Sequence, residues 1–220
     1  MNKQFYIFIG RSGCGKGTQA ELLKTYIESG LSTISNLENT ENTNLEVDAG
    51  NVNQNKVIHI TTGGSFREFV NGDSESAKIS RNINQTGGLQ PEFLAIWNWS
   101  NIFINQLTGK ESVILDGAPR RLIEIPALKS ALDFYGYEKT IVVYLDVTNA
   151  WAIERLMGRG REDDTDSAEV NKKMAWFESD VVPVINWYNS DPEYRFVHIN
   201  GEQSIEDIHM QIVAKVASLV

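Results

Sequence analysis

The sequence holds few of the residues that build disulfides, metal sites and membrane spans. It has one cysteine, Cys14, and three histidines among 220 residues. One cysteine excludes an internal disulfide bond and a zinc site based on several cysteines. No apolar run approaches the roughly 18 residues that span a bilayer, and the N-terminus shows no cleavage-site pattern. We therefore expect a cytoplasmic protein with no membrane partner.

Positive charge is also scarce. Lysine and arginine number 20, against 29 aspartates and glutamates, and the formal net charge is −9. A general nucleic-acid binder is usually basic, so we expect no nucleic-acid partner. The chain is 41% hydrophobic and 22% charged. This composition suits a folded domain with a real core, although the length alone leaves one or two domains open.

Short apolar runs alternate with helical patterns along the chain. The runs at residues 5–9, 57–60, 113–115, 141–145 and 196–199 are rich in β-branched and aromatic residues. They predict strands buried in a parallel sheet. Helical periodicity occupies residues 15–29, 91–107, 148–157, 177–188 and 205–216. This alternation indicates an α/β fold with a mostly parallel sheet.

Residues 31–56 break the alternation. The segment contains seven asparagines and little apolar periodicity. Its composition favours a mobile surface insertion. A partner-binding loop is the alternative that the sequence leaves open.

The stretch GRSGCGKGT follows the first predicted strand and precedes the first predicted helix. Gly10 to Lys16 match G-x-x-x-x-G-K, a pattern whose glycines let backbone N–H groups turn inward around an anion. The helix that follows aims its positive end at the same anion, and Lys16 adds a full charge. Such a combination rarely arises by chance. It predicts a loop that binds nucleotide phosphates.

Four motifs in order resemble the adenylate kinase family. In GKGTQ, Gly17 stands between the lysine and Thr18, as in nucleoside monophosphate kinases. TTGGSFR at 61–67, ILDGAPR at 114–120 and ERLMGRGREDD at 154–164 follow in family order. A glycine-containing turn, TGGLQPEF, lies at 86–93, and HINGEQSIEDI at 198–208 loosely resembles the family's adenine-side loop. The resemblance covers nearly the whole chain except the Asn-rich insertion.

The resemblance implies a P-loop NTPase fold with a five-stranded parallel sheet flanked by helices. It implies one nucleoside monophosphate kinase domain over residues 1–220. This domain has a mobile monophosphate-binding segment at about 62–93 and a short lid at about 159–167, without the four metal-binding residues of longer lids and without protein-bound zinc. The implied reaction is ATP + AMP to two ADP with Mg²⁺, carried out by a monomer. Three alternatives stay open: another acceptor (GMP, CMP or UMP), a nucleotide-binding module with weakened catalysis, and a P-loop kinase for a small metabolite.

The resemblance also implies roles for individual residues. Donor ATP would be bound by Gly10, Gly13, Cys14, Gly15, Lys16, Gly17, Thr18, Arg155, Arg159 and Gln203. The acceptor would be bound by Thr62, Gly63, Arg67, Leu89, Gln90, Gly117, Arg120 and Glu124. The catalytic cations would be Lys16, Arg120, Arg159 and Arg161, and Asp116 would hold Mg²⁺ through water. Asp163 and Asp164 would fix the lid arginines. An acidic protein that joins two nucleotides has to concentrate cations in one cleft, and these motif positions supply them.

Three positions depart from the family pattern. Gly64 replaces an aspartate, Lys173 stands near a lid-side arginine position, and Glu124 replaces a glutamine. A carboxylate only accepts hydrogen bonds, so Glu124 favours guanine or an amino-bearing pyrimidine, whereas the resemblance favours adenine. The scattered histidines and the tryptophans at 97, 99, 176 and 187 are interpreted as structural or packing residues.

Overall fold

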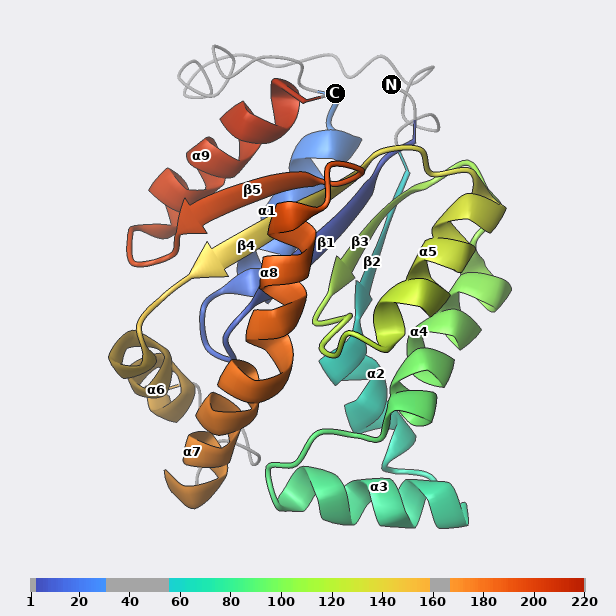
Figure 1. The fold of residues 1–220 in the computed structure, drawn as a ribbon, viewed down its shortest axis with the longest axis vertical. Helices are drawn as coiled ribbons and strands as arrows, with labels where there is room; N and C mark the ends of the chain where they lie inside the picture. Colours follow the sequence, from blue (N-terminus) through green and yellow to red (C-terminus); the bar gives the residue numbers. More distant parts are fainter. Residues whose placement is uncertain (1–2, 31–55, 159–166, 220) are drawn as a thin grey trace.

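A computed structural model describes residues 3–30, 56–158 and 167–219 (Figure 1). Its centre is an all-parallel, five-stranded sheet in the order β2-β3-β1-β4-β5. The strands are β1 (Phe5–Gly10), β2 (Val57–Thr61), β3 (Ser112–Asp116), β4 (Thr140–Asp146) and β5 (Arg195–Asn200). Each predicted strand lies within one residue of the observed one at either end. The α/β fold with a five-stranded parallel sheet is confirmed.

Both faces of the sheet are covered by helices. On one face, Tyr6 and Phe8 of β1 belong to a core cluster with residues of α1 (Lys16–Glu28), α6 (Asn149–Gly158) and α9 (Ile205–Ala217). On the other face, Phe5 and Ile7 belong to a cluster with residues of α4 (Glu92–Gln106), α5 (Glu124–Tyr135) and α8 (Val182–Ser190). Burial on both faces explains why the strands read as continuous apolar runs instead of alternating ones.

Several elements extend past the carboxyl ends of the strands. Helices α2 (Thr62–Phe69) and α3 (Glu75–Gln85) follow β2, and α6 and α7 (Ser167–Trp176) lie across from them (Figure 1). Because the strands are parallel, their carboxyl ends share one edge, which is where open α/β sheets bind ligands. The first and third strand therefore deliver their following loops to the same place.

The predicted helix at 177–188 lies in the second half of a longer helical run. Helix α7 continues through a π-helical turn, η3 (Phe177–Val181), into α8. The four apolar residues that suggested the helix, Phe177, Val181, Val184 and Tyr188, are all buried. The helical run extends further towards the N-terminus than predicted, and the buried Val170 and Met174 of α7 continue the same spacing.

Two predicted segments lie outside the described residues. They are 31–55 of the Asn-rich segment and 159–166 of the expected lid, which includes Arg159, Arg161, Asp163 and Asp164. Within the part of the chain that is described, no helix combines the length and the apolar character needed to cross a membrane.

Candidate active site

A cavity of about 1040 Å³ lies at the carboxyl edge of the sheet. Its lining comes from the loop before α1, the start of α2, the loop before α4, the loop after β3, and helices α6 and α7. Most of the predicted site residues meet here: Gly13, Gly15, Lys16, Gly17, Thr18, Thr62, Gly63, Arg67, Leu89, Gln90, Asp116, Gly117, Arg120, Glu124 and Arg155. Gly10, Cys14 and Gln203 are not among the described residues that line it.

The loop between β1 and α1 depends on its glycines. Gly13 and Gly15 have φ values of 88° and 94°, in the left-handed region that favours glycine. A Cβ on Gly13 would also lie 2.6 Å from the backbone oxygen of Ala152. Helix α1 starts at Lys16, and none of the described side chains caps it. Its first N–H groups are therefore suited to an anion in the cavity.

Lys16 reaches back over this loop. Its Nζ donates to the carbonyl oxygens of Gly10 and Arg11, each at 2.8 Å, and lies 3.6 Å from Sγ of Cys14. Cys14 is buried in the core under the loop, and burial raises the pKa of its thiol although the Lys16 ammonium lowers it. The structure thus places the thiol behind the loop and the lysine on the cavity side.

Two guanidinium groups occupy the opposite side of the cavity. Nε of Arg120 donates to the Gly117 oxygen at 2.8 Å, and Arg67 lies close enough to act on its charge. Burial lowers the pKa of Arg120, and the positive charge of Arg67 lowers it further, while Glu124 and Asp116 oppose this. The two positive charges in one cavity repel each other, and an anion bound between them would offset this repulsion.

Gly117 makes room for Arg120, and Gly63 lies at ordinary contact distance from Arg67. A Cβ on Gly117 would lie 3.2 Å from Nη2 of Arg120 and 2.9 Å from Oγ1 of Thr62. A Cβ on Gly63 would lie 3.5 Å from Nη1 of Arg67. The Thr62 hydroxyl donates to the Gly117 oxygen at 2.9 Å, which ties the end of β2 to the loop after β3. The motif residues that follow β2 and those that follow β3 therefore line one pocket.

Asp116 ends β3 beside the start of α1. Its Oδ2 would lie 3.5 Å from a Cβ on Gly17, so its carboxylate faces the phosphate-binding loop. One carboxylate beside bound phosphates fits Mg²⁺, which usually keeps several waters and takes few protein ligands.

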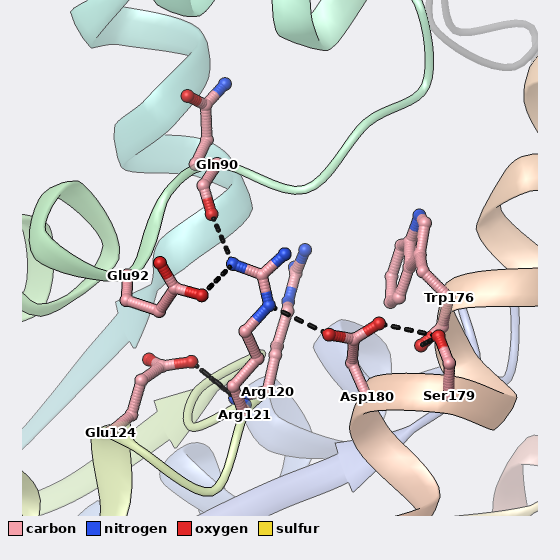
Figure 2. A network of polar contacts seen from close by, with 8 residues as sticks. All are labelled: Gln90, Glu92, Arg120, Arg121, Glu124, Trp176, Ser179 and Asp180. Atoms are coloured by element: carbon pink, nitrogen blue, oxygen red, sulfur yellow. Dashed lines mark hydrogen bonds and ion pairs between the residues drawn. The ribbon is translucent and has the colours of Figure 1, made fainter.

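Glu124 occupies a more constrained position than the sequence indicated. It is 2% exposed, and its Oε1 accepts hydrogen bonds from the backbone N–H groups of Arg120 at 2.9 Å and Arg121 at 3.1 Å (Figure 2). Burial raises the pKa of the Glu124 carboxyl, while these N–H groups, the Arg120 charge and the side chain of Trp99 favour the ionised form. Glu124 thus holds the loop after β3 in addition to lining the cavity.

Trp176 packs against the core, as interpreted from the sequence, and it also lines the cavity. Its ring lines the cavity, its Nε1 donates to the Gly87 oxygen at 3.2 Å, and the Arg120 guanidinium lies 5.3 Å from the ring centre. Trp151 also lines the cavity, with the Arg155 guanidinium 4.4 Å from its ring. Helical spacing on α6 places Trp151 one turn before Arg155, which was the signal available in the sequence.

The remaining residues that the sequence singled out include one that lines the cavity and several that do not. Lys173, on α7, is buried and lines it. Gln203, in the loop between β5 and α9, donates to the Asn200 oxygen and accepts from Gln211 of α9. His59 and His198 pair with Glu21 and Asp146, in agreement with a structural role.

Comparison with known proteins agrees with the site. The family model described as adenylate kinase matches residues 47–193, well over half of the chain. Adenylate kinase of Phocaeicola vulgatus is 29% identical over 219 residues, which cover 97% of this chain and 98% of that protein. Adenylate kinase 1 of Nostoc sp. is 26% identical over 212 residues, which cover 96% and 98%. The matched motifs and the two-sided cavity lead to the same conclusion: the chain belongs to the adenylate kinase family.

Proposed function

We propose that this phosphotransferase moves the terminal phosphoryl group of ATP to a nucleoside monophosphate, with AMP as the preferred acceptor. The observation that carries the proposal is the pair Arg67 and Arg120 in the same cavity as the phosphate-binding loop. One anion site suits a donor's phosphates and the other suits an acceptor's phosphate.

The chemistry follows from charge and position. Phosphoryl transfer needs in-line placement of the two nucleotides and neutralisation of charge on the moving group. Lys16 would leave the carbonyls of Gly10 and Arg11 for the donor's outer phosphates, and Arg120 would hold the acceptor's phosphate beside them. Arg120, which its bond to the Gly117 oxygen already holds in place, would stabilise the transition state with little reorganisation.

The donor side extends over α6. Arg155, stacked on Trp151, would lie by the donor base, and Gly13, Gly15, Gly17 and Thr18 would surround its phosphates. Arg159 and Arg161 are proposed to close over the phosphates and exclude water. Asp116 would hold Mg²⁺ through water, and the bound ion would neutralise phosphate charge.

The acceptor preference rests on the relatives, which are named adenylate kinases. Glu124 favours the second candidate, a kinase for GMP, because a carboxylate accepts from the ring N–H and the 2-amino group of guanine but has nothing to offer N1 of adenine. We propose a monomer, since one chain supplies all the described lining of the cavity.

The test is a transfer assay with ATP and each of AMP, GMP, CMP and UMP, using wild type and Lys16→Ala. We expect kcat/KM to be highest with AMP, and the variant to lose at least about 100-fold in kcat with little change in Tm. Lys24→Ala, on the same helix and paired with Glu21, is the matched control. Turnover of Lys16→Ala within about tenfold of wild type, or 1.4 kcal/mol, would overturn the proposal.

A further inference from the structure

Residues 86–92 run along the acceptor side of the cavity, from the end of α3 to the first residue of α4. We call them the crossing segment. It carries Leu89 and Gln90, which line the same cavity as Glu124. The position of this segment therefore decides the shape of the acceptor site.

Helix α7 holds the first half of the crossing segment. Lys172 Nζ donates to the Thr86 oxygen at 3.0 Å, and Trp176 Nε1 donates to the Gly87 oxygen at 3.2 Å. Gly87 packs closely on α7, because a Cβ there would lie 3.0 Å from the Glu169 oxygen. These contacts join two parts of the chain that are more than 80 residues apart.

Arg121 holds the second half. Its Nη1 donates to the Gln90 oxygen at 3.2 Å and to Oε1 of Glu92 at 3.0 Å. Its Nε donates to Oδ1 of Asp180 at 2.9 Å, on the π-helical turn η3. Figure 2 shows the guanidinium between these groups, with Asp180 oriented towards it by Ser179. One side chain thus connects the crossing segment to the helical run that covers the sheet.

This arrangement differs from an ordinary surface ion pair. The side chains of Arg121 and Asp180 are only 25% and 26% exposed. A planar guanidinium directs its donors in fixed directions, which a lysine ammonium does not reproduce. The backbone N–H of Arg121 also donates to Glu124, so the residue contacts both sides of the acceptor site.

We propose that Arg121 is a positioning residue for the acceptor: it fixes the crossing segment against Asp180 and thereby sets the affinity for the monophosphate. The proposal rests on the proposed function, since it names the acceptor as the ligand of this side of the cavity. Arg121 acts on binding of the acceptor and leaves the donor side unchanged, because its contacts all lie away from the phosphate-binding loop.

The kinetic test compares Arg121→Ala and Arg121→Lys with Lys129→Ala. The control removes an exposed ion pair between Lys129, on α5, and Glu193. We expect Arg121→Ala to raise KM for AMP roughly 5- to 20-fold, the effect of losing one or two charge-assisted hydrogen bonds. KM for ATP and kcat should stay within about twofold, and Arg121→Lys should recover only part of the loss. Equal rises in both KM values, or an unchanged KM for AMP, would overturn the proposal.

A second measurement does not depend on activity. Hydrogen exchange of the nucleotide-free protein should be faster in residues 87–92 of Arg121→Ala than in wild type, and unchanged in α9. Lys129→Ala should exchange as wild type does. Unchanged exchange in the crossing segment would overturn the positioning role. Absence of transfer to any monophosphate by wild type would instead overturn the proposed function, with the exchange result still valid.

Discussion

Glu124 is a buried carboxylate with one oxygen committed to two backbone N–H groups. Glutamine at this position can keep the same acceptor oxygen for Arg120 and Arg121. Its amide nitrogen can also donate to N1 of adenine, which a carboxylate cannot do. We therefore expect Glu124→Gln to improve the preference for AMP over GMP by roughly 5- to 100-fold. The measurement is kcat/KM for all four monophosphates in both proteins.

The pH dependence of that preference gives a control. Burial raises the pKa of Glu124, so its carboxyl takes up a proton at a higher pH than an ordinary glutamate does. A protonated carboxyl donates as an amide does, and the AMP to GMP ratio of wild type should rise as the pH is lowered. The ratio of Glu124→Gln should stay flat. The same ratio in both proteins at every pH would mean that Glu124 does not touch the base.

At the scale of the element, the first turn of α2 contains two glycines, and one of them, Gly64, has no room for a side chain unless a neighbour shifts. A Cβ on Gly64 would lie 2.3 Å from Oγ1 of Thr61. A side chain at position 64 therefore requires Thr61 to shift. Gly63, by contrast, meets only the Arg67 side chain at ordinary contact distance.

We expect Gly64→Ala to lower the free energy of unfolding by about 1 kcal/mol. Overpacking costs roughly 1–3 kcal/mol, and the better helix propensity of alanine returns up to about 1 kcal/mol. Removing the Thr61 hydroxyl in Thr61→Ala/Gly64→Ala should recover the loss. Among the described contacts the Thr61 side chain makes no helix-capping bond, so Thr61→Ala alone is a mild control. Urea unfolding of all four proteins measures the coupling, and strict additivity would contradict this account.

The loop before β3 depends on Glu111, which is 3% exposed. Its carboxylate accepts from the Thr108 hydroxyl at 2.6 Å and from the N–H groups of Thr108 and Lys110 at 3.0 and 3.2 Å. Burial pushes the pKa of Glu111 up, but these hydrogen bonds outweigh it and hold the pKa at about 2. A depressed pKa contributes stability above the unfolded value of 4.5, and that stability is lost as the pH falls from there towards 2.

Glu111→Gln should therefore lower the free energy of unfolding at pH 7 by about 1–3 kcal/mol, the loss of hydrogen bonds to a charged group. The difference from wild type should shrink as the pH is lowered from 5 to 3. Glu138→Gln, at an exposed position, should show no such pH dependence. Thermal unfolding over this pH range provides the measurement, and a difference that stays constant with pH would contradict the assignment.

Local sequence was sufficient for the strands and for the phosphate-binding loop, because both depend on residues close together in the chain. It was insufficient for α2 and α3, and α5 was not predicted although its pattern is present in the sequence. Helix α2 opens with two glycines, α3 buries only Ala77 and Ser80, and α5 contains Pro126. In α5 the buried Ile125, Leu128 and Leu132 already have helical spacing, so that helix was within reach.

The missed parts of the site share one cause. Trp176 and Arg121 acquire their contacts from segments far apart in sequence, namely 86–92, 120–124 and 176–180. A motif names the residues that meet a ligand, whereas the residues that hold those in place are defined by tertiary packing. The latter therefore required the structure.

At the scale of the whole molecule, α1 and β2 meet across the Asn-rich segment. The Val57 N–H donates to Oε1 of Glu28 at 3.1 Å, so the chain leaves and returns at neighbouring points. Replacing residues 31–55 with a short glycine–serine linker should keep Tm within about 3 °C and kcat/KM within about twofold. Closing a loop costs little, about 0.6 kcal/mol for each doubling of its length. Thermal unfolding and the transfer assay check this, and loss of folding or of monophosphate binding would show that the segment belongs to the working structure.

The order of the strands has a consequence for recombination between related genes. The proposed acceptor residues follow one another along the chain from Thr62 to Glu124, on the β2 and β3 half of the sheet. The proposed donor residues come from both ends of the chain, on β1 and after β4. A single exchange of coding sequence between β2 and α5 would therefore transfer acceptor choice, together with Asp116, while the phosphate-binding loop stays that of the recipient. The recipient would have to match the incoming piece along β1, which pairs with β3, in the core shared with α8, and at positions on α7 and η3 such as Trp176 and Asp180.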